Sequence, residues 1–245
     1  MSDMRYKKRY EVKFMIDFDT YKRLLKTLGP FITPDRNWKQ QDGKYCIRSV
    51  YFDSPAKDFY KEKIEGENFR NKIRIRTYYS LNNEKSKTFL EIKKRYDKTL
   101  KKIKVRISEE DAKKFINRPD FSGDYIKNLD EKSIVILQEV ATLATRFKIR
   151  PIVVVSYTRQ AFIGRYSPNV RITFDSNLKY KTREYELDKK NLIRYIIPPN
   201  FIIFEIKYSG MLPVWIPQII GKYNLQHMSF SKYCKSVEKF VEDGI

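Results

Sequence analysis

Residues 72–78 read KIRIRTY, and this stretch decides the predicted fold because charged and apolar residues alternate along it. Side chains of a β-strand point alternately to its two faces. Lys72, Arg74 and Arg76 therefore share one face, whereas Ile73 and Ile75 occupy the other. The same alternation recurs in FLEIK (89–93), KIKVRI (102–107) and FEIKY (204–208). The sequence predicts a sheet with one apolar face and one cationic face.

Three further strand candidates extend the cationic face: one near the start of the chain, one in VVVSYTRQAF (153–162) and one in VRITFD (170–175). Eleven basic residues fall on this face, namely Lys13, Lys72, Arg74, Arg76, Lys93, Lys102, Lys104, Arg106, Arg159, Arg171 and Lys207. Four acidic residues share it, namely Glu11, Glu91, Asp175 and Glu205. The excess is seven positive charges on one predicted surface.

An ordinary half-solvated sheet is the alternative interpretation of this pattern. Such faces usually mix charges of both signs, because like charges directly across a strand pair destabilise it by roughly 0.2–1 kcal/mol each. The imbalance here repeats from strand to strand, which favours a site built for a polyanion.

Strand signals fall at about 5–15, 45–53, 69–79, 87–95, 100–107, 151–162, 169–176 and 201–208. Helices are predicted from Asp17 or Asp19 to Leu28, from Ser108 onward, over 131–147 and over 229–243. We predict an α+β fold in which eight antiparallel strands close into a barrel, with a charged lumen and the helices packed outside. No linker or repeat divides the chain, so residues 1–245 are predicted to form a single domain.

The formal net charge of +21 and the pI near 9.7 indicate a phosphate-rich partner, whether nucleic acid, an anionic membrane surface or a phosphorylated small molecule. The two cysteines, Cys46 and Cys234, are spaced as neither a disulfide framework nor a zinc motif. Neither a signal peptide nor a transmembrane segment is evident. We therefore expect a soluble, cytoplasmic protein.

The residue inventory limits the chemistry. One histidine, His227, excludes histidine-based triads and multi-histidine metal sites, and the chain has no glycine-rich phosphate loop. Arginine and lysine side chains must therefore hold any phosphate. Phosphoryl transfer also needs a divalent metal, for which Glu205 is the first candidate ligand. The alternative for Glu205 is an ion pair with Lys207 or a neighbouring arginine, while Glu11 and Glu91 are expected to orient nearby lysines.

Two smaller features extend the candidate site. Ser231 and Lys232 lie at the start of the last predicted helix, where a phosphate could meet the helix amides and both side chains. A plain N-cap serine followed by a solvated lysine explains them equally well. Tyr51, Tyr157 and Tyr208 are candidates to stack a nucleotide base, although core packing explains most of the aromatic residues better.

Nine segments occur in an order that resembles a known family: YEVKF, SVYFDS, KIRIRTY, FLEIKKR, KIKVR, YTRQAF, VRITFD, FEIKYSG and FSKY. This is the order found in the VTC domain, the catalytic domain of the vacuolar transporter chaperone polyphosphate polymerase, within the triphosphate tunnel metalloenzymes. The resemblance covers roughly residues 5–240 and is specific in order and spacing.

The resemblance implies a tunnel fold and metal-dependent transfer of the ATP γ-phosphate onto a growing polyphosphate chain. Lys13, Arg74, Arg76, Lys93, Arg159 and Arg171 would match the catalytic, phosphate-binding residues of the family. Glu205 would match its metal-binding glutamate, with Mn²⁺ or Mg²⁺ as the ion, and Ser231 and Lys232 its closing phosphate contacts. Strand alternation adds Lys104, Arg106 and Lys207 as phosphate-binding residues.

The chain departs from related CYTH triphosphatases, which carry ExExK on the first strand, because it reads Arg9, Glu11 and Lys13. Loss of the first carboxylate favours a one-metal transferase over a two-metal hydrolase.

The expected partners are ATP and inorganic polyphosphate, with a membrane-protein partner suggested by the family and nucleic acid disfavoured. The eukaryotic complex adds an SPX module and membrane helices, for which this sequence shows no counterpart, and the oligomeric state is not predicted. The alternatives are a triphosphatase on the same fold and a non-catalytic module that binds polyphosphate or nucleic acid.

Overall fold

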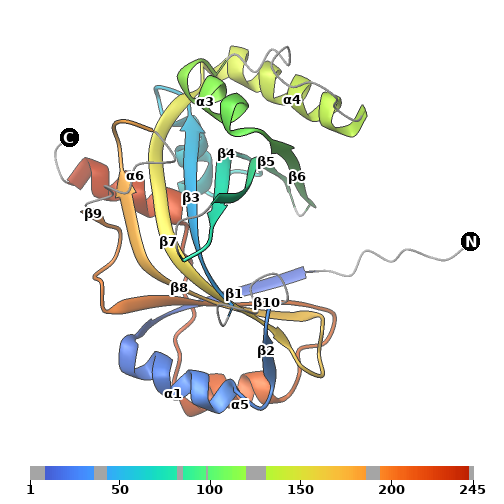
Figure 1. The fold of residues 1–245 in the computed structure, drawn as a ribbon, viewed down its shortest axis with the longest axis vertical. Helices are drawn as coiled ribbons and strands as arrows, with labels where there is room; N and C mark the ends of the chain where they lie inside the picture. Colours follow the sequence, from blue (N-terminus) through green and yellow to red (C-terminus); the bar gives the residue numbers. More distant parts are fainter. Residues whose placement is uncertain are drawn as a thin grey trace, which may run out of the picture. The chain divides into compact units, whose positions relative to one another are not determined.

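Figure 1 shows a computed structural model that describes residues 9–35, 43–81, 85–97, 99–119, 131–185 and 194–242. The strands are β1 (Arg9–Asp17), β2 (Ile32–Pro34), β3 (Lys44–Asp53), β4 (Phe69–Tyr79), β5 (Lys85–Tyr96), β6 (Thr99–Ile107), β7 (Arg150–Gly164), β8 (Val170–Lys181), β9 (Arg194–Tyr195) and β10 (Phe201–Ser209). The helices are α1 (Phe18–Leu28), α2 (Asp58–Ile64), α3 (Glu109–Asn117), α4 (Glu131–Phe147), α5 (Trp215–Lys222) and α6 (Lys232–Glu242).

The strands form one sheet in the order β1-β10-β8-β7-β3-β4-β5-β6, with β2 added beside β7 and β9 beside β8. All eight predicted strands are present, residues 5–8 of the first lying outside the described ranges, and the predicted antiparallel α+β class is confirmed. The predicted closed barrel matches only roughly, since in the described chain β1 and β6 end the strand order without pairing to each other. A barrel closes only when its first and last strands share hydrogen bonds, and lysines along an edge strand such as β6 disfavour such pairing.

The described chain divides into two compact units, each built from separate stretches of sequence. Unit 1 comprises Met1–Cys46, Tyr157–Leu178 and Ile197–Phe230, and unit 2 comprises Ile47–Ser156, Lys179–Ile196 and Ser231–Ile245. Each unit has its own apolar core. That residues 1–245 behave as a single domain stays a prediction.

The core of unit 1 lies between the sheet and helices α1 and α5, which run close together in Figure 1. The α1 residues Leu24 and Leu28 are at most 1% exposed, as are Phe204 and Ile206 of β10. Of the two predicted caps, Asp17 or Asp19, it is Asp17 that caps α1, its carboxylate accepting the Thr20 amide at 2.7 Å. The apolar side of β10 therefore faces helices, so its charged residues occupy the opposite face.

The core of unit 2 repeats this arrangement with α2, α3 and α4 against β4, β5 and β6. Ile73, Ile75 and Ile92 are fully buried there beside Phe115 of α3. Ser108 caps α3 as predicted, accepting the Asp111 amide at 3.0 Å. Burial of the isoleucines leaves the lysines and arginines of β4 on the other face, as the alternation in residues 72–78 predicts.

Two helices, α2 and α5, were not predicted. Each is at most eight residues long, α2 follows Lys57 in the left-handed region (φ 58°), and α5 contains both a proline and a glycine.

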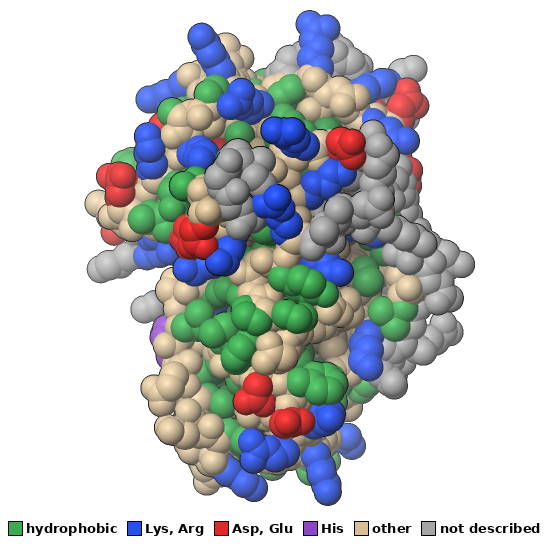
Figure 2. All heavy atoms as spheres, turned by 90° about the vertical axis from the view of Figure 1, so that its left-hand side faces the viewer, with side chains coloured by type: hydrophobic (Ala, Val, Ile, Leu, Met, Phe, Trp, Pro, Cys, Tyr) green, Lys and Arg blue, Asp and Glu red, His purple; other side chains and the backbone are tan. Residues whose placement is uncertain are grey.

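None of the helices in the described ranges has the length and apolar character that a membrane span requires. Figure 2 shows more basic than acidic side chains on the face that it draws, in keeping with the net charge of +21.

Candidate functional site

The charged face of unit 1 is arranged in rows that cross three neighbouring strands. Glu11 of β1 lies opposite Lys207 of β10, which lies opposite Arg171 of β8. In the adjacent row, Lys13 lies opposite Glu205, and Glu205 lies opposite Thr173. Directly opposed residues of antiparallel strands lie on the same face with Cβ atoms about 5 Å apart. Acidic and basic side chains therefore lie opposite each other between β1 and β10, whereas Lys207 of β10 faces a second cation, Arg171, on β8.

Contacts in these rows pair the charges closely. Lys13 Nζ lies 2.6 Å from Glu11 Oε1 and donates to the Phe230 carbonyl at 2.9 Å. Lys207 Nζ contacts Glu205 Oε1 and lies 3.6 Å from Glu11 Oε2. Glu205 is only 4% exposed. Partial burial lowers the pKa of Lys207 to about 7, although Glu11 acts to raise it.

Two arginines complete the charged face of unit 1. Arg159 makes a bidentate pair with Asp175, with N–O distances of 2.6 and 2.7 Å, and Asp175 raises the pKa of Arg159 above its usual value despite the opposing effect of burial. Arg171 donates from Nη2 to Asp35 at 2.9 Å and to the Tyr45 hydroxyl at 3.3 Å. Four cations, Lys13, Arg159, Arg171 and Lys207, thus meet four carboxylates, Glu11, Asp35, Asp175 and Glu205. The charged face of unit 1 is nearly balanced, with Arg9 of β1 as one further cation on it.

The charged face of unit 2 has the opposite character. Its rows run across β4, β5 and β6 and comprise Lys72–Lys93–Lys102, Arg74–Glu91–Lys104 and Arg76–Phe89–Arg106. These three rows hold seven cations and one carboxylate, an excess of six positive charges, and Arg70 and Arg95 add two further cations on the same face. The first row places three lysines directly across from one another, which costs stability. Stability of the fold therefore does not explain why three lysines are aligned in this row.

Glu91 is the centre of the unit 2 charged face and is 2% exposed. Arg74 donates to its Oε2 from Nε at 2.7 Å and from Nη2 at 2.5 Å, while Lys102 Nζ lies 3.5 Å from Oε1. Arg76 Nη1 lies 3.9 Å from Oε2. Burial alone would raise the pKa of Glu91, but Arg74, Arg76 and Lys102 lower it to about 2. One carboxylate therefore fixes three cations without neutralising them.

Lys72 joins the start of α6 to this face. Its Nζ donates to Ser231 Oγ at 3.3 Å and lies over the rings of Tyr51 and Tyr233, 5.3 and 5.6 Å from their centroids. Burial lowers the pKa of Lys72 to about 8. The Tyr51 hydroxyl accepts from Arg74 Nη1 at 3.1 Å, and although burial would raise its pKa, Arg74 and Lys72 lower it to about 7.

The remaining predicted residues lie on or beside these two faces. Lys93 and Arg106 occupy the unit 2 rows, and Lys104 Nζ lies 3.4 Å from the centroid of the Phe89 ring. Lys232 opens α6 directly after Ser231. Glu11 and Glu91 orient neighbouring lysines as predicted, although Glu91 holds Arg74 more closely than Lys102.

Two residues of the unit 1 face were missed from the sequence. Asp35 follows β2, outside any alternating strand, so no strand pattern pointed to it. Thr173 does carry the alternation signal, because it lies between Arg171 and Asp175 on β8. It is 1% exposed, and its Oγ1 has no hydrogen-bond partner among the described residues. A buried hydroxyl without a partner beside Glu205 is unusual enough to need a role.

The described residues contain no group of three or more His, Cys, Asp or Glu side chains placed to hold a metal. Glu11 and Glu205 nevertheless converge on the Lys207 ammonium, which occupies the position of a cation between them. Divalent ions that act on phosphates commonly take one or two protein carboxylates and complete their shell with phosphate oxygens and water. The donor set of unit 1 fits an ion of that kind.

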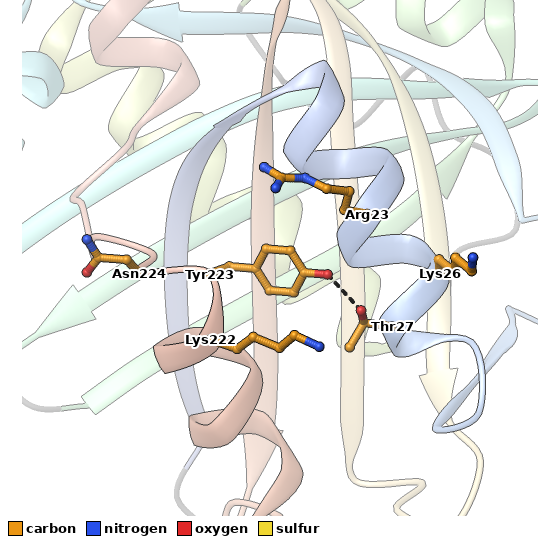
Figure 3. Close-up of a pocket in the computed structure, with 6 residues that line it drawn as sticks. All are labelled: Arg23, Lys26, Thr27, Lys222, Tyr223 and Asn224. Atoms are coloured by element: carbon orange, nitrogen blue, oxygen red, sulfur yellow. Dashed lines mark hydrogen bonds between the residues drawn. The ribbon is translucent and has the colours of Figure 1, made fainter.

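A pocket on unit 1 lies apart from these residues. It has a volume of about 480 Å³ and is lined by Arg23, Lys26, Thr27, Lys222, Tyr223 and Asn224 from α1 and the end of α5 (Figure 3). The Thr27 and Tyr223 hydroxyls lie 2.7 Å apart, and Lys26 points away from that pair. None of the predicted site residues lines this pocket.

Comparison with known proteins places the chain in a family. The VTC domain family matches residues 8–241, and this chain belongs to that family. A putative adenylate cyclase from Bacillus halodurans aligns with a TM-score of 0.50 at 15% identity, covering 90% of this chain and 92% of the other. A putative adenylyl cyclase from Hippeastrum, described as having a dominant triphosphatase activity, aligns with a TM-score of 0.53 at 13% identity, covering 91% and 93%. These two likenesses show a shared fold, while no curated protein sequence matches this chain.

Proposed function

We propose that this protein is a metal-dependent polyphosphate polymerase, which transfers the γ-phosphate of ATP to a growing polyphosphate chain. The observation that carries the proposal is the charged face of unit 2, where seven cations share one buried carboxylate. Like charges aligned across strands lower stability, so a bound polyanion that offsets their repulsion explains their presence. Membership of the VTC domain family agrees with this substrate class.

The cations of unit 2 have the chemistry to bind and orient phosphoryl groups. Arg74 and Arg76 offer planar guanidinium groups that are fixed by Glu91, so their geometry is set before the substrate arrives. Lys72 and Ser231 add a further ammonium and a hydroxyl at the start of α6. The terminal phosphate of an acceptor chain is already ionised, so the transfer requires no general base.

Glu205, with Glu11, would hold the divalent ion in unit 1. When bound, Mn²⁺ or Mg²⁺ would neutralise phosphate charge and favour departure of ADP. Lys13 is held beside these carboxylates by Glu11 and the Phe230 carbonyl, so its ammonium stays directed at the same face. Arg159 is compensated by Asp175, so it contributes fixed geometry more than net charge.

Hydrolysis of a triphosphate is the second candidate. It is favoured by the shared fold with the Hippeastrum protein, described as a triphosphatase. Hydrolysis needs an activated water, and the positions of the first strand that correspond to ExExK supply Glu11 alone, with Arg9 in place of the other carboxylate that a two-metal site would use. A binding module without turnover is the third candidate, and it would show steep salt dependence with no metal requirement.

The discriminating experiment is incubation of the purified protein with ATP and Mn²⁺, followed by separation of the products by gel electrophoresis. Polymerisation yields ADP together with a ladder of long phosphate chains. Free phosphate without polymer would support the triphosphatase, and unchanged ATP would support the binding module. An Arg74→Ala variant should lose activity and ATP affinity together, because Arg74 would bind the phosphates in both the ground state and the transition state.

A further inference from the structure

The Lys207 ammonium lies between the two carboxylates that are proposed to hold the metal ion. Lys207 Nζ contacts Glu205 Oε1 and lies 3.6 Å from Glu11 Oε2, so one ammonium is shared by two carboxylates. The other oxygen of Glu11 pairs with Lys13 at 2.6 Å. Among the ion pairs of the described residues, Glu205 is paired with Lys207 alone.

A third oxygen lies on the same face. Thr173 is the cross-strand neighbour of Glu205 on the side away from Lys13. Its Oγ1 is buried and makes no hydrogen bond within the described chain. A buried hydroxyl normally finds a partner, because leaving it unsatisfied costs about 1–3 kcal/mol. Two carboxylates and one unpartnered hydroxyl are oxygen donors of the type that Mg²⁺ and Mn²⁺ prefer.

We propose that Lys207 and the catalytic metal are alternative occupants of the Glu11–Glu205 carboxylate pair, with Thr173 Oγ1 as an additional donor to the metal. This inference rests on the metal site of the proposed function and adds a competitor to it. Lys207 keeps the buried Glu205 compensated before the ion arrives, since an unpaired buried carboxylate is costly. An ion held by both carboxylates would lie close to the ammonium, so repulsion between the two cations disfavours their joint occupancy of the pair.

Displacement has a consequence for Lys207. Its cross-strand neighbour away from Glu11 is Arg171, so the released ammonium remains beside another cation of the charged face. The side chain is 42% exposed, which leaves it room to turn away from Glu205. Phosphate oxygens would then give Lys207 a new partner, and metal loading would prepare one further phosphate contact.

The test measures binding of Mn²⁺ alone to the full chain by electron paramagnetic resonance of the free ion. Lys207→Met removes the ammonium and keeps an unbranched apolar stem. Its Mn²⁺ dissociation constant should fall about tenfold, since a site that is mostly occupied by a competitor loses affinity by that fraction. Lys207→Gln should act in the same direction, and it replaces the Met variant if that variant fails to fold.

Matched variants separate this effect from a general change in charge. Lys222→Met removes one cation from the same unit in the pocket of Figure 3, and salt should keep its effect on Mn²⁺ affinity within about twofold. Lys207→Arg retains the cation and should not tighten Mn²⁺ binding. In Glu205→Gln, the additional Lys207→Met change should no longer strengthen binding, because the shared oxygen has lost its charge. Thr173→Val should weaken Mn²⁺ binding in the Lys207→Met background.

Equal Mn²⁺ affinity in wild type, Lys207→Met and Lys222→Met would overturn the inference, as would absence of Mn²⁺ binding from all of them. The outcome is independent of the reaction catalysed. Tighter binding in Lys207→Met together with no polyphosphate ladder would support the competition and reject the polymerase. A polyphosphate ladder together with unchanged Mn²⁺ affinity in Lys207→Met would support the polymerase and reject the competition.

Discussion

Units 1 and 2 both place an apolar sheet face under helices and a charged face on the other side, yet they treat charge in opposite ways. Unit 1 matches Lys13, Arg159, Arg171 and Lys207 with four carboxylates. Unit 2 sets seven cations around Glu91 and aligns three lysines across neighbouring strands. A balanced face is fit to exchange one cation for another, whereas an unbalanced face is fit to attract an anion. The difference suggests a division of labour between metal and phosphate binding.

The largest expected difference in stability is between variants of Glu91 and variants of Glu205. Glu91→Gln leaves Arg74, Arg76 and Lys102 without their shared carboxylate, so the free energy of unfolding should fall by about 3–5 kcal/mol. Glu205→Gln should cost only about 1–2 kcal/mol, because Lys207 retains Glu11 and is partly solvated. Urea denaturation of both variants checks this order, and equal losses would remove the proposed contrast between the units.

Glu205→Gln should also lower the rate of catalysis. Glu205→Gln is expected to lower kcat with Mn²⁺ by at least about 100-fold, since loss of an outer-shell partner of a metal ligand alone costs about 10–100-fold and Glu205 is proposed to bind the ion directly. Its effect on ATP binding should be smaller, because the cations of unit 2 are untouched. Steady-state kinetics and ATP titration report the two quantities separately. Wild-type turnover in Glu205→Gln would remove this residue from the metal role.

Acid should weaken unit 2 through Glu91. The pKa of this carboxyl is about 2 in the folded protein and 4.5 in its ordinary state, so the folded state favours the ionised form. The resulting stabilisation is complete above the unfolded value and is lost as pH falls from about 4.5 towards 2. Chemical denaturation across this range should show a steeper loss of stability in wild type than in Glu91→Gln, and parallel curves would contradict the assignment.

A smaller effect tests the row of three lysines. Lys93 lies between Lys72 and Lys102, so Lys93→Thr should raise the free energy of unfolding by about 0.2–1 kcal/mol through removal of like-charge repulsion. Its polyphosphate affinity should fall at the same time. Lys94→Thr is the matched control, because Lys94 lies on the other face of β5 and pairs with Glu139. Thermal melts in which both variants are destabilised equally would argue against stored repulsion.

The sequence predicted the strands and their faces because both depend on alternation along a single segment. Ile73, Ile75, Phe204 and Ile206 are all buried, as the pattern required. The balance of charge in unit 1 could not be predicted, since it depends on which distant strands pair: β1 with β10, and β10 with β8.

Features outside the strands gave no comparable signal. Asp35, just after the end of β2, accepts a hydrogen bond from Arg171, and no spacing in the sequence predicts that contact. Ser231 was found from its position at a helix start, but its link to Lys72 depends on how α6 docks within unit 2. Local periodicity thus predicts which residues share a strand face, and tertiary pairing decides which charges remain uncompensated.

The most direct test of the account is the salt dependence of polyphosphate binding, measured by calorimetry without metal. A variant with Lys72, Lys93 and Lys102 changed to Gln should lower the slope of log affinity against log salt by about two, since each cation that contacts a phosphate contributes about 0.7 in a single-stranded polyanion. Changing Arg23, Lys26 and Lys222 to Gln removes the same charge from the pocket of Figure 3 and should leave the slope unchanged. An unchanged slope in the first variant, or an equal fall in both, would contradict the claim that the cationic face of unit 2 binds the phosphate chain.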